Sequence, residues 1–170
     1  MTSERSTSGV SGDPALLGIY LNDHLAGATV GVELSNRAAR SHRGSHLGDV
    51  LTQYSTEIAE DREALLALMR ELDVPVRQYK VYGARAAEML GRLKPNGRLL
   101  SRSPLSTLIE VETLRLGVEG KFCLWRALRE LAEHDDRLDT GRLDDLLGRA
   151  RHEADTLEEL RAEAATTVFG

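Results

Sequence analysis

One stretch, residues 104–134, constrains the fold more than any other part of the chain. It reads PLSTLIEVETLRLGVEGKFCLWRALRELAEH and has no proline after its first residue, so it can form one helix about 45 Å long. Ser103 and Pro104 suit the N-cap and first turn of that helix. A helix that is apolar around most of its circumference is expected to be buried by several neighbours. Its three apolar stripes are Val111, Leu114, Val118, Phe122 and Trp125; Leu105, Ile109, Leu116, Cys123 and Ala127; and Leu124, Leu128 and Leu131.

The composition favours a helical protein over a sheet protein. Aromatic residues make up only 4% of the chain and hydrophobic residues 41%, so Leu, Ala and Val must build the core. The single cysteine, Cys123, excludes an internal disulfide and agrees with a reducing compartment. We find no leader-like pattern and no apolar run long enough to span a bilayer. These features predict a cytoplasmic protein with no membrane span.

The order of helical segments predicts the architecture. Residues 1–12 are rich in Ser, Thr and Gly and are expected to form a disordered tail, followed by a single domain over 13–170. Helices are expected near 14–41, 45–72, 104–134 and 141–167, with a shorter one at 76–93. Short links join the first pair and the last pair, and about thirty residues separate the pairs. Two antiparallel hairpins joined by a long crossover that contains a short fifth helix are typical of a ferritin-like four-helix bundle.

Apolar spacing assigns an inward face to each helix. Gly27 and Gly31, one turn apart, are expected to let another helix approach closely. The short fifth helix is expected to pack outside the bundle through Tyr79, Tyr82, Met89 and Leu93, with Arg85 and Arg92 kept out of the interior. The inward residues expected on the first helix are Leu21, Leu25, Ala28, Val32, Ser35 and Ala39; on the second, Leu47, Leu51, Tyr54, Ile58, Asp61, Leu65, Leu68 and Leu72; and on the last, Leu143, Leu146, Leu147, Ala150, Ala154, Leu157, Ala164 and Val168.

Two stretches carry a resemblance to a known family. The segments YLNDHLAGATVGVELSNRAARSH and LRLGVEGKFCLWRALREL resemble a family of bacterial helical-bundle proteins with no established activity. In helix and connection lengths the chain is similar to the ferritin-like superfamily, which implies a four-helix bundle. The resemblance implies no particular reaction.

Acidic residues in the middle of the helices raise the possibility of a metal site. Ferritin-like dimetal centres use glutamates from all four helices and two Glu-x-x-His pairs, which suit iron or manganese. No Glu-x-x-His occurs in this chain. The alternative is therefore a carboxylate-only iron or manganese site in an oxidase or iron-handling protein. Its candidate ligands are Glu33, Glu57, Asp61, Glu112 and Glu119.

A purely structural interpretation accounts for most of these acids. Opposite charges three and four residues apart on the long helix predict a salt-bridged polar stripe of Glu112, Arg115, Glu119, Arg126 and Glu130. Asp61 lies on the apolar face between Ile58 and Leu65, so it needs a partner, expected to be Arg37, Arg62 or an arginine of the long helix. Cys123 has apolar neighbours in the pattern and is expected to pack rather than react.

The charge of the chain is unevenly distributed. Residues 74–103 carry a net charge of +6, which leaves −11 for the rest of a chain whose total is −5. The segment has few aromatics for base stacking and the chain is acidic overall, which argues against nucleic acid. Segregated charge of this kind suits an anion or an acidic protein partner. The candidate docking residues are Arg77, Lys80, Arg85, Arg92, Lys94, Arg98 and Arg102.

Together these patterns favour a non-enzymatic helical bundle without the usual dimetal site and without a cofactor. Such a protein is expected to act through protein–protein contacts, including contacts in a homodimer. No catalytic residue is assigned.

Overall fold

The structure, a computed structural model, describes residues 13–77 and 103–170. Within these ranges all regular structure is helical, in four long helices: α1 (Pro14–Ser41), α2 (His46–Glu71), α4 (Pro104–Leu131) and α5 (Thr140–Phe169). No helix in the two ranges is both long and apolar enough to cross a membrane. The expected all-helical bundle is confirmed at this level, with helix ends within three residues of the expected positions.

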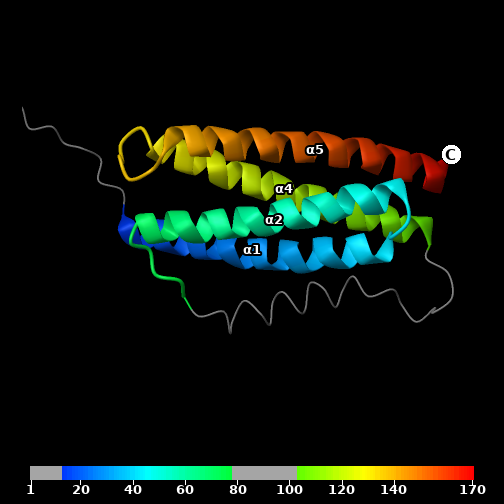
Figure 1. The fold of residues 1–170 in the computed structure, drawn as a ribbon, viewed down its shortest axis with the longest axis horizontal. Helices are drawn as coiled ribbons and strands as arrows, with labels where there is room; N and C mark the ends of the chain where they lie inside the picture. Colours follow the sequence, from blue (N-terminus) through cyan, green and yellow to red (C-terminus); the bar gives the residue numbers. More distant parts are fainter. Residues whose placement is uncertain (1–12, 78–102) are drawn as a thin grey trace, which may run out of the picture.

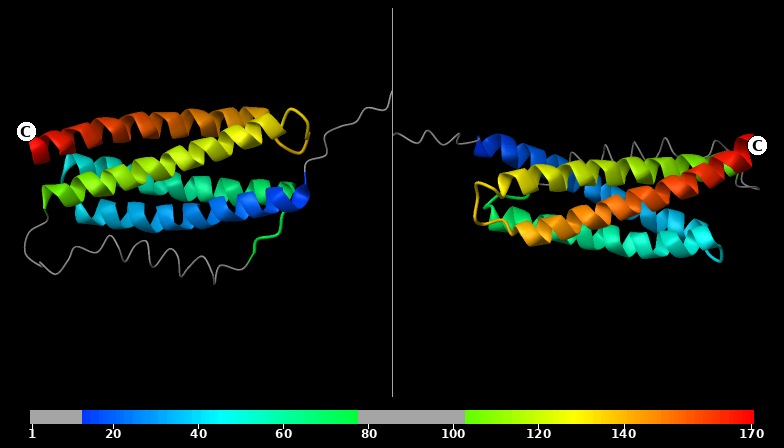
Figure 2. Two further views of the ribbon diagram at one scale, coloured as in Figure 1. Left: turned by 180° about the vertical axis from the view of Figure 1, so that it is seen from behind. Right: turned by 90° about the horizontal axis from the view of Figure 1, so that it is seen from above.

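The four helices form two antiparallel hairpins that pack side by side (Figure 1). Helix α1 packs on α2, α4 packs on α5, and α1 also contacts α4 closely. The backbones of α2 and α5 approach each other at few points, so side chains fill most of the space between them. Both views in Figure 2 show α2 ending at one end of the bundle and α4 beginning at the other. Residues 78–102 therefore connect opposite ends.

Side-chain caps mark where the helices begin. Asp13 accepts a hydrogen bond from the backbone N–H of Ala15, Ser45 from that of Gly48, and Asp139 from that of Arg142. Each cap satisfies a donor that the first helical turn leaves unpaired. The expected side-chain cap at Ser103 is wrong, because Ser103 makes no such bond at the start of α4.

The α1–α2 turn depends on two glycines. Gly44 has a φ of 84°, a left-handed conformation that glycine adopts without a steric penalty. A Cβ atom at Gly48 would collide with the carbonyl group of His42. The turn is therefore closed by backbone packing that larger residues would disrupt.

The core consists of two apolar clusters placed one after the other along the bundle. The first cluster surrounds Trp125, which is 1% exposed and confirmed as a core residue, and the second surrounds Tyr54. The first contains Leu21, Leu25, Leu65, Leu68, Met69, Leu72, Leu124, Trp125, Leu128, Ala132, Leu138, Leu143, Leu146 and Ala150. The second contains Leu34, Ala38, Ala39, Leu51, Tyr54, Ile58, Val111, Leu114, Val118, Leu157 and Leu160.

Several expected details of packing are wrong. The second apolar stripe of the long helix is exposed rather than buried, with Leu116 at 69%, because neighbouring helices cover only the other faces of α4. A Cβ atom at Gly27 would meet nothing within 4 Å, so no described helix packs closely there, whereas one at Gly31 would lie 3.6 Å from Ile58. Val76 is not helical, and the rest of the expected fifth helix, with Tyr79, Tyr82, Arg85, Met89, Arg92 and Leu93, lies outside the described residues.

Candidate functional site

Charged residues interrupt the apolar seam of three helices. A seam in which core residues recur at alternating three- and four-residue steps is the pattern of packed helical bundles. On α2 it runs 51, 54, 58, 61, 65, 68 and 72; on α4, 111, 114, 118, 121, 125 and 128; on α5, 143, 146, 150, 153, 157 and 160. Every position in these seams is apolar except Asp61, Lys121 and Glu153. These three residues separate the two core clusters.

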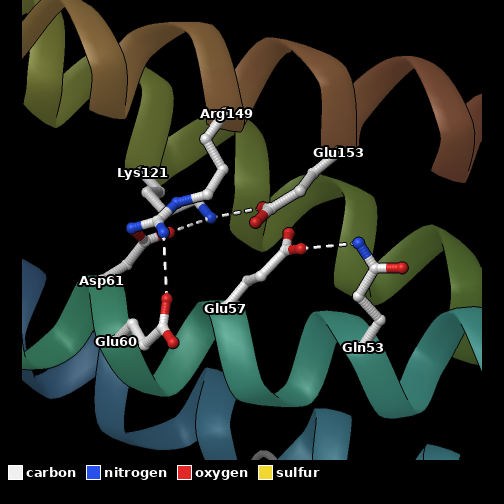
Figure 3. Close-up of polar contacts among 7 residues, drawn as sticks. All are labelled: Gln53, Glu57, Glu60, Asp61, Lys121, Arg149 and Glu153. Carbon is white, nitrogen blue, oxygen red and sulfur yellow. Dashed lines mark hydrogen bonds and ion pairs between the residues drawn. The ribbon is translucent and has the colours of Figure 1, made fainter.

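The three side chains meet between α2, α4 and α5, as Figure 3 shows. The Lys121 ammonium lies 2.5 Å from Asp61 Oδ2 and also donates to Glu153 Oε2. Arg149 of α5 donates to Asp61 and, over 3.1 Å, to Glu60 at the surface. We call Asp61, Lys121, Arg149 and Glu153 the charge layer. Two cations and two carboxylates make it close to neutral, which a buried ionic group requires.

Glu153 has the most perturbed carboxyl group in the charge layer. Its side chain is fully buried, and burial raises its pKa to about 7. Lys121 opposes this shift, whereas Asp61 and Glu57 reinforce it. Near neutral pH the buried carboxyl group therefore exists in both protonation states, which surface glutamates do not do.

An apolar groove opens between α1 and α4 beside the charge layer. It has a volume of about 570 Å³, and Asp61 and Lys121 lie among its lining residues. Gly27, Gly117 and Gly120 also line it, and a Cβ atom at any of the three would meet no neighbour within 4 Å. The groove walls are otherwise mainly aliphatic, with Trp125 near one end. The groove therefore joins open apolar space to the partly buried ammonium group of Lys121.

Large apolar side chains are exposed on both helices that border this groove. Five of the seven large apolar residues that are exposed within the described ranges lie on the outward sides of α1 and α4. We call this surface the α1–α4 face; its exposed residues are Leu16, Ile19, Leu105, Ile109 and Leu116. Leu16 and Ile19 lie near the start of α1 and Leu105 and Ile109 near the start of α4, at opposite ends of the bundle, so these side chains are spread along the whole face.

The candidate ligands of the alternative metal site are not gathered at one place. Glu33 and Glu119 are exposed on different helices, and Glu112 lies 3.9 Å from Arg161 of α5. Glu57, which accepts from Gln53, and Asp61 lie at the charge layer. Within residues 13–77 and 103–170, no three His, Cys, Asp or Glu side chains are arranged to hold a metal ion.

Three further expectations are corrected. The partners of Asp61 are Lys121 and Arg149, because these two side chains reach it across the bundle from α4 and α5. Cys123 is exposed on α4 instead of packing in the core. The polar stripe of α4 pairs partly with α5, because Arg115 lies 2.9 Å from Glu158. Among the five residues of the stripe, the pair within α4 is Arg126–Glu130, at 4.0 Å.

The basic segment can be placed only at its first residue. Arg77 is exposed, and its backbone N–H donates to the side chain of Asn22, which also bonds to the carbonyl of Pro75. The chain therefore leaves α2 along the surface of α1. The remaining docking candidates, Lys80, Arg85, Arg92, Lys94, Arg98 and Arg102, lie outside the described residues.

Lys121, Glu153 and Arg149 were missed as site residues by the reasoning from sequence. The signal for Lys121 was present, because it occupies the seam position between Val118 and Trp125, where every other seam residue of α4 is apolar. Arg149 carries no comparable signal, since it lies beside the seam position Ala150 and reaches the charge layer through its long side chain.

No protein-family model matches this chain, and no curated protein or solved structure matches it either. Its function is therefore inferred from its own residues.

Proposed function

We propose that this chain is a non-enzymatic, ferritin-like bundle of the cytoplasm that acts through protein–protein contacts made by the α1–α4 face, first of all with a second copy of itself. The observation that carries the proposal is the concentration of exposed large apolar residues on this one face. Leu116 and Leu16 are 69% and 64% exposed. Covering such side chains stabilises an interface by about 25 cal/mol per Å² of apolar surface.

The ferritin-like part of the proposal is supported by topology. The two hairpins are antiparallel, and the chain between them connects opposite ends of the bundle. This is the connectivity of ferritin-like bundles with one long crossover.

The charge layer supports a function without metal chemistry. The Lys121 ammonium lies between the Asp61 and Glu153 carboxylates, and Arg149 also binds Asp61. A dication would have to displace these cations, and arginine does not shed its charge. Of the candidate ligands of the alternative, a carboxylate-only iron or manganese centre, Glu57 and Asp61 lie at the charge layer, so metal content is a direct test.

Self-association can be tested by sedimentation of three proteins. The wild-type chain is expected to sediment as a dimer, and Ile109→Glu, which places a charge on the α1–α4 face, as a monomer. Phe169→Glu is the matched control, because Phe169 is 75% exposed at the end of α5, away from this face. A wild-type monomer at all concentrations, or a dimer unaffected by Ile109→Glu, would contradict the homodimer.

The metal alternative can be tested by elemental analysis. Protein expressed with added iron and manganese, and purified without chelator, is expected to contain neither metal in stoichiometric amount. Near-stoichiometric metal that disappears in Asp61→Ala would overturn the non-enzymatic proposal and establish the alternative.

A further inference from the structure

We propose that the groove between α1 and α4 binds a linear aliphatic carboxylic acid, with its carboxylate on Lys121 and its chain extending along α1 and α4 toward Leu34 and Leu114. This inference goes beyond the proposed function, because it assigns a small molecule to the floor of the groove and does not depend on dimerisation.

The groove has the size and lining of a small-molecule site. Its volume of about 570 Å³ lies within the range of about 300–1,000 Å³ that is usual for ligand pockets. Its walls combine aliphatic side chains, such as Leu34 and Val118, with three glycines that leave space. Water in such a groove has few polar partners, so an apolar chain can displace it favourably.

The charges along the groove favour a carboxylate as the head group. A lysine ammonium has three donors, and two of those on Lys121 bind Asp61 and Glu153. Lys121 lines the groove, and we assign its third donor to a ligand oxygen. Asp61 accepts from two cations, Lys121 and Arg149, and Arg62 is a further cation on the groove lining, so a ligand cation would meet these positive groups. When Glu153 is protonated, a ligand carboxylate supplies the negative charge that the layer has lost.

The geometry of the groove sets the direction and length of the ligand. Lys121 is four residues from Trp125, which is about 6 Å along the axis of α4. It is eight residues from Thr113, which is about 12 Å along the same axis. The shorter arm ends at the polar pair Asp23 and His24, whereas the longer arm is apolar apart from Thr113. An extended chain advances about 1.2 Å per bond, so the longer arm accommodates about ten carbons.

The first experiment compares head groups on one chain length. Calorimetric titration of the full-length protein, and of Ile109→Glu protein, with decanoate is expected to show saturable one-to-one binding below the concentration at which decanoate aggregates. Decyltrimethylammonium, with the same chain and a cationic head, is expected to bind at least about tenfold more weakly. Equal affinity for both amphiphiles, or no decanoate binding to either protein, would overturn the proposal.

The second experiment fills the groove. Gly117→Leu and Gly120→Leu place side chains in open groove space and favour helix, so both variants are expected to fold and to bind decanoate at least about tenfold more weakly. Gly148→Leu on α5 is the matched control, because a Cβ there also meets nothing within 4 Å but Gly148 does not line the groove. Unchanged binding by both groove variants, or equal loss in the control, would show that decanoate binds elsewhere.

The third experiment tests orientation with the only tryptophan of the chain, Trp125, which lines the groove. Decanoate brominated next to its carboxyl group is expected to quench Trp125 fluorescence more strongly than decanoate brominated at its tail. Stronger quenching by the tail-labelled acid would overturn the assignment of the carboxylate to Lys121. Absence of quenching by both acids would overturn the site itself.

Discussion

The α1–α4 side and the α2–α5 side of the bundle border the same charge layer, but they shield it from solvent to different degrees. On the α2–α5 side, ion pairs bridge the helices: Arg142 lies 2.9 Å from Glu71, and Arg149 lies 3.1 Å from Glu60. On the α1–α4 side, the layer opens into an apolar groove that is lined in part by glycines. At one end of the bundle, His42 after α1 lies 3.1 Å from Glu110 of α4.

This difference separates stability from binding within one small domain. Ion pairs between partly exposed side chains close the α2–α5 side and contribute modestly to stability. The α1–α4 side leaves apolar surface uncovered, which contributes nothing to folding but is available for a partner or a ligand. A bundle of this kind can place its rigid part and its recognition surface on opposite sides.

Removing the largest side chain of the groove wall should have the largest effect. Trp125→Ala is expected to lower the free energy of unfolding by about 3–5 kcal/mol, because Trp125 is 1% exposed in the first core cluster. Urea denaturation followed by circular dichroism measures this change. A variant that unfolds at nearly the same urea concentration as wild type would show that the groove side contributes little to the core.

Removing the shared cation should cost somewhat less. Lys121→Met is expected to destabilise the protein by about 3 kcal/mol, because it leaves two buried carboxylates, one of which can take up a proton. Arg129→Met, on the same helix, removes a surface pair with Asp144 and should cost less than about 1 kcal/mol. Equal effects in the two variants would mean that the charge layer behaves as a surface network.

Glu153 should give the bundle a pH-dependent stability. Its pKa is raised to about 7 in the folded protein, so the folded state binds this proton more tightly than the unfolded state. The stabilising effect is therefore complete at pH values below about 4.5 and is lost as pH rises through 7. Between pH 5 and pH 8 the loss should be about 2.5 kcal/mol.

Urea denaturation across that pH range, with two variants, checks the assignment. Glu153→Gln should remove the decline in stability, whereas Glu159→Gln, at an exposed position of the same helix, should retain it. A decline that persists in Glu153→Gln would place the titrating group elsewhere.

The smallest effect is expected from the glycines of the groove. Gly27→Ala and Gly117→Ala should each raise the free energy of unfolding by about 1 kcal/mol, because their added methyl groups meet open space and alanine favours helix. Gly48→Ala should instead destabilise the protein, since its Cβ collides with the His42 carbonyl. Thermal unfolding of the three variants distinguishes these signs, and a destabilised Gly117→Ala would show that the groove is closed.

The spacing of apolar residues, together with prolines and a glycine at the helix ends, was sufficient to predict the four described helices. Pro14, Gly44, Pro75 and Pro104 mark real boundaries, and the expected inward face of α2 is buried at every position from Leu51 to Leu72. On α1 the prediction was less complete, because Leu34 and Ala38 are also buried whereas Ala28 and Val32 are only partly so. A local pattern defines a face to within about one residue per turn.

The site was harder to predict because it depends on contacts between helices. Asp61 stood out as an acid within an apolar face, but the sequence does not say which distant cation reaches it. Lysine carries a long aliphatic stem, so Lys121 in a seam resembles a surface residue until its neighbours are known. Exposure of the Leu105, Ile109 and Leu116 stripe likewise depends on how many helices surround α4.

The charge layer also determines how the helices can slide past one another. The residues seven positions on either side of Lys121 are Leu114 and Leu128, and those around Glu153 are Leu146 and Leu160. A bundle shifted by one heptad would set the Lys121 ammonium against leucine and leave it unpaired, which is strongly unfavourable. Purely aliphatic seams would tolerate such slippage. One ionic level in the middle of the bundle therefore selects a single register among packings that the leucines alone would leave nearly equal in energy.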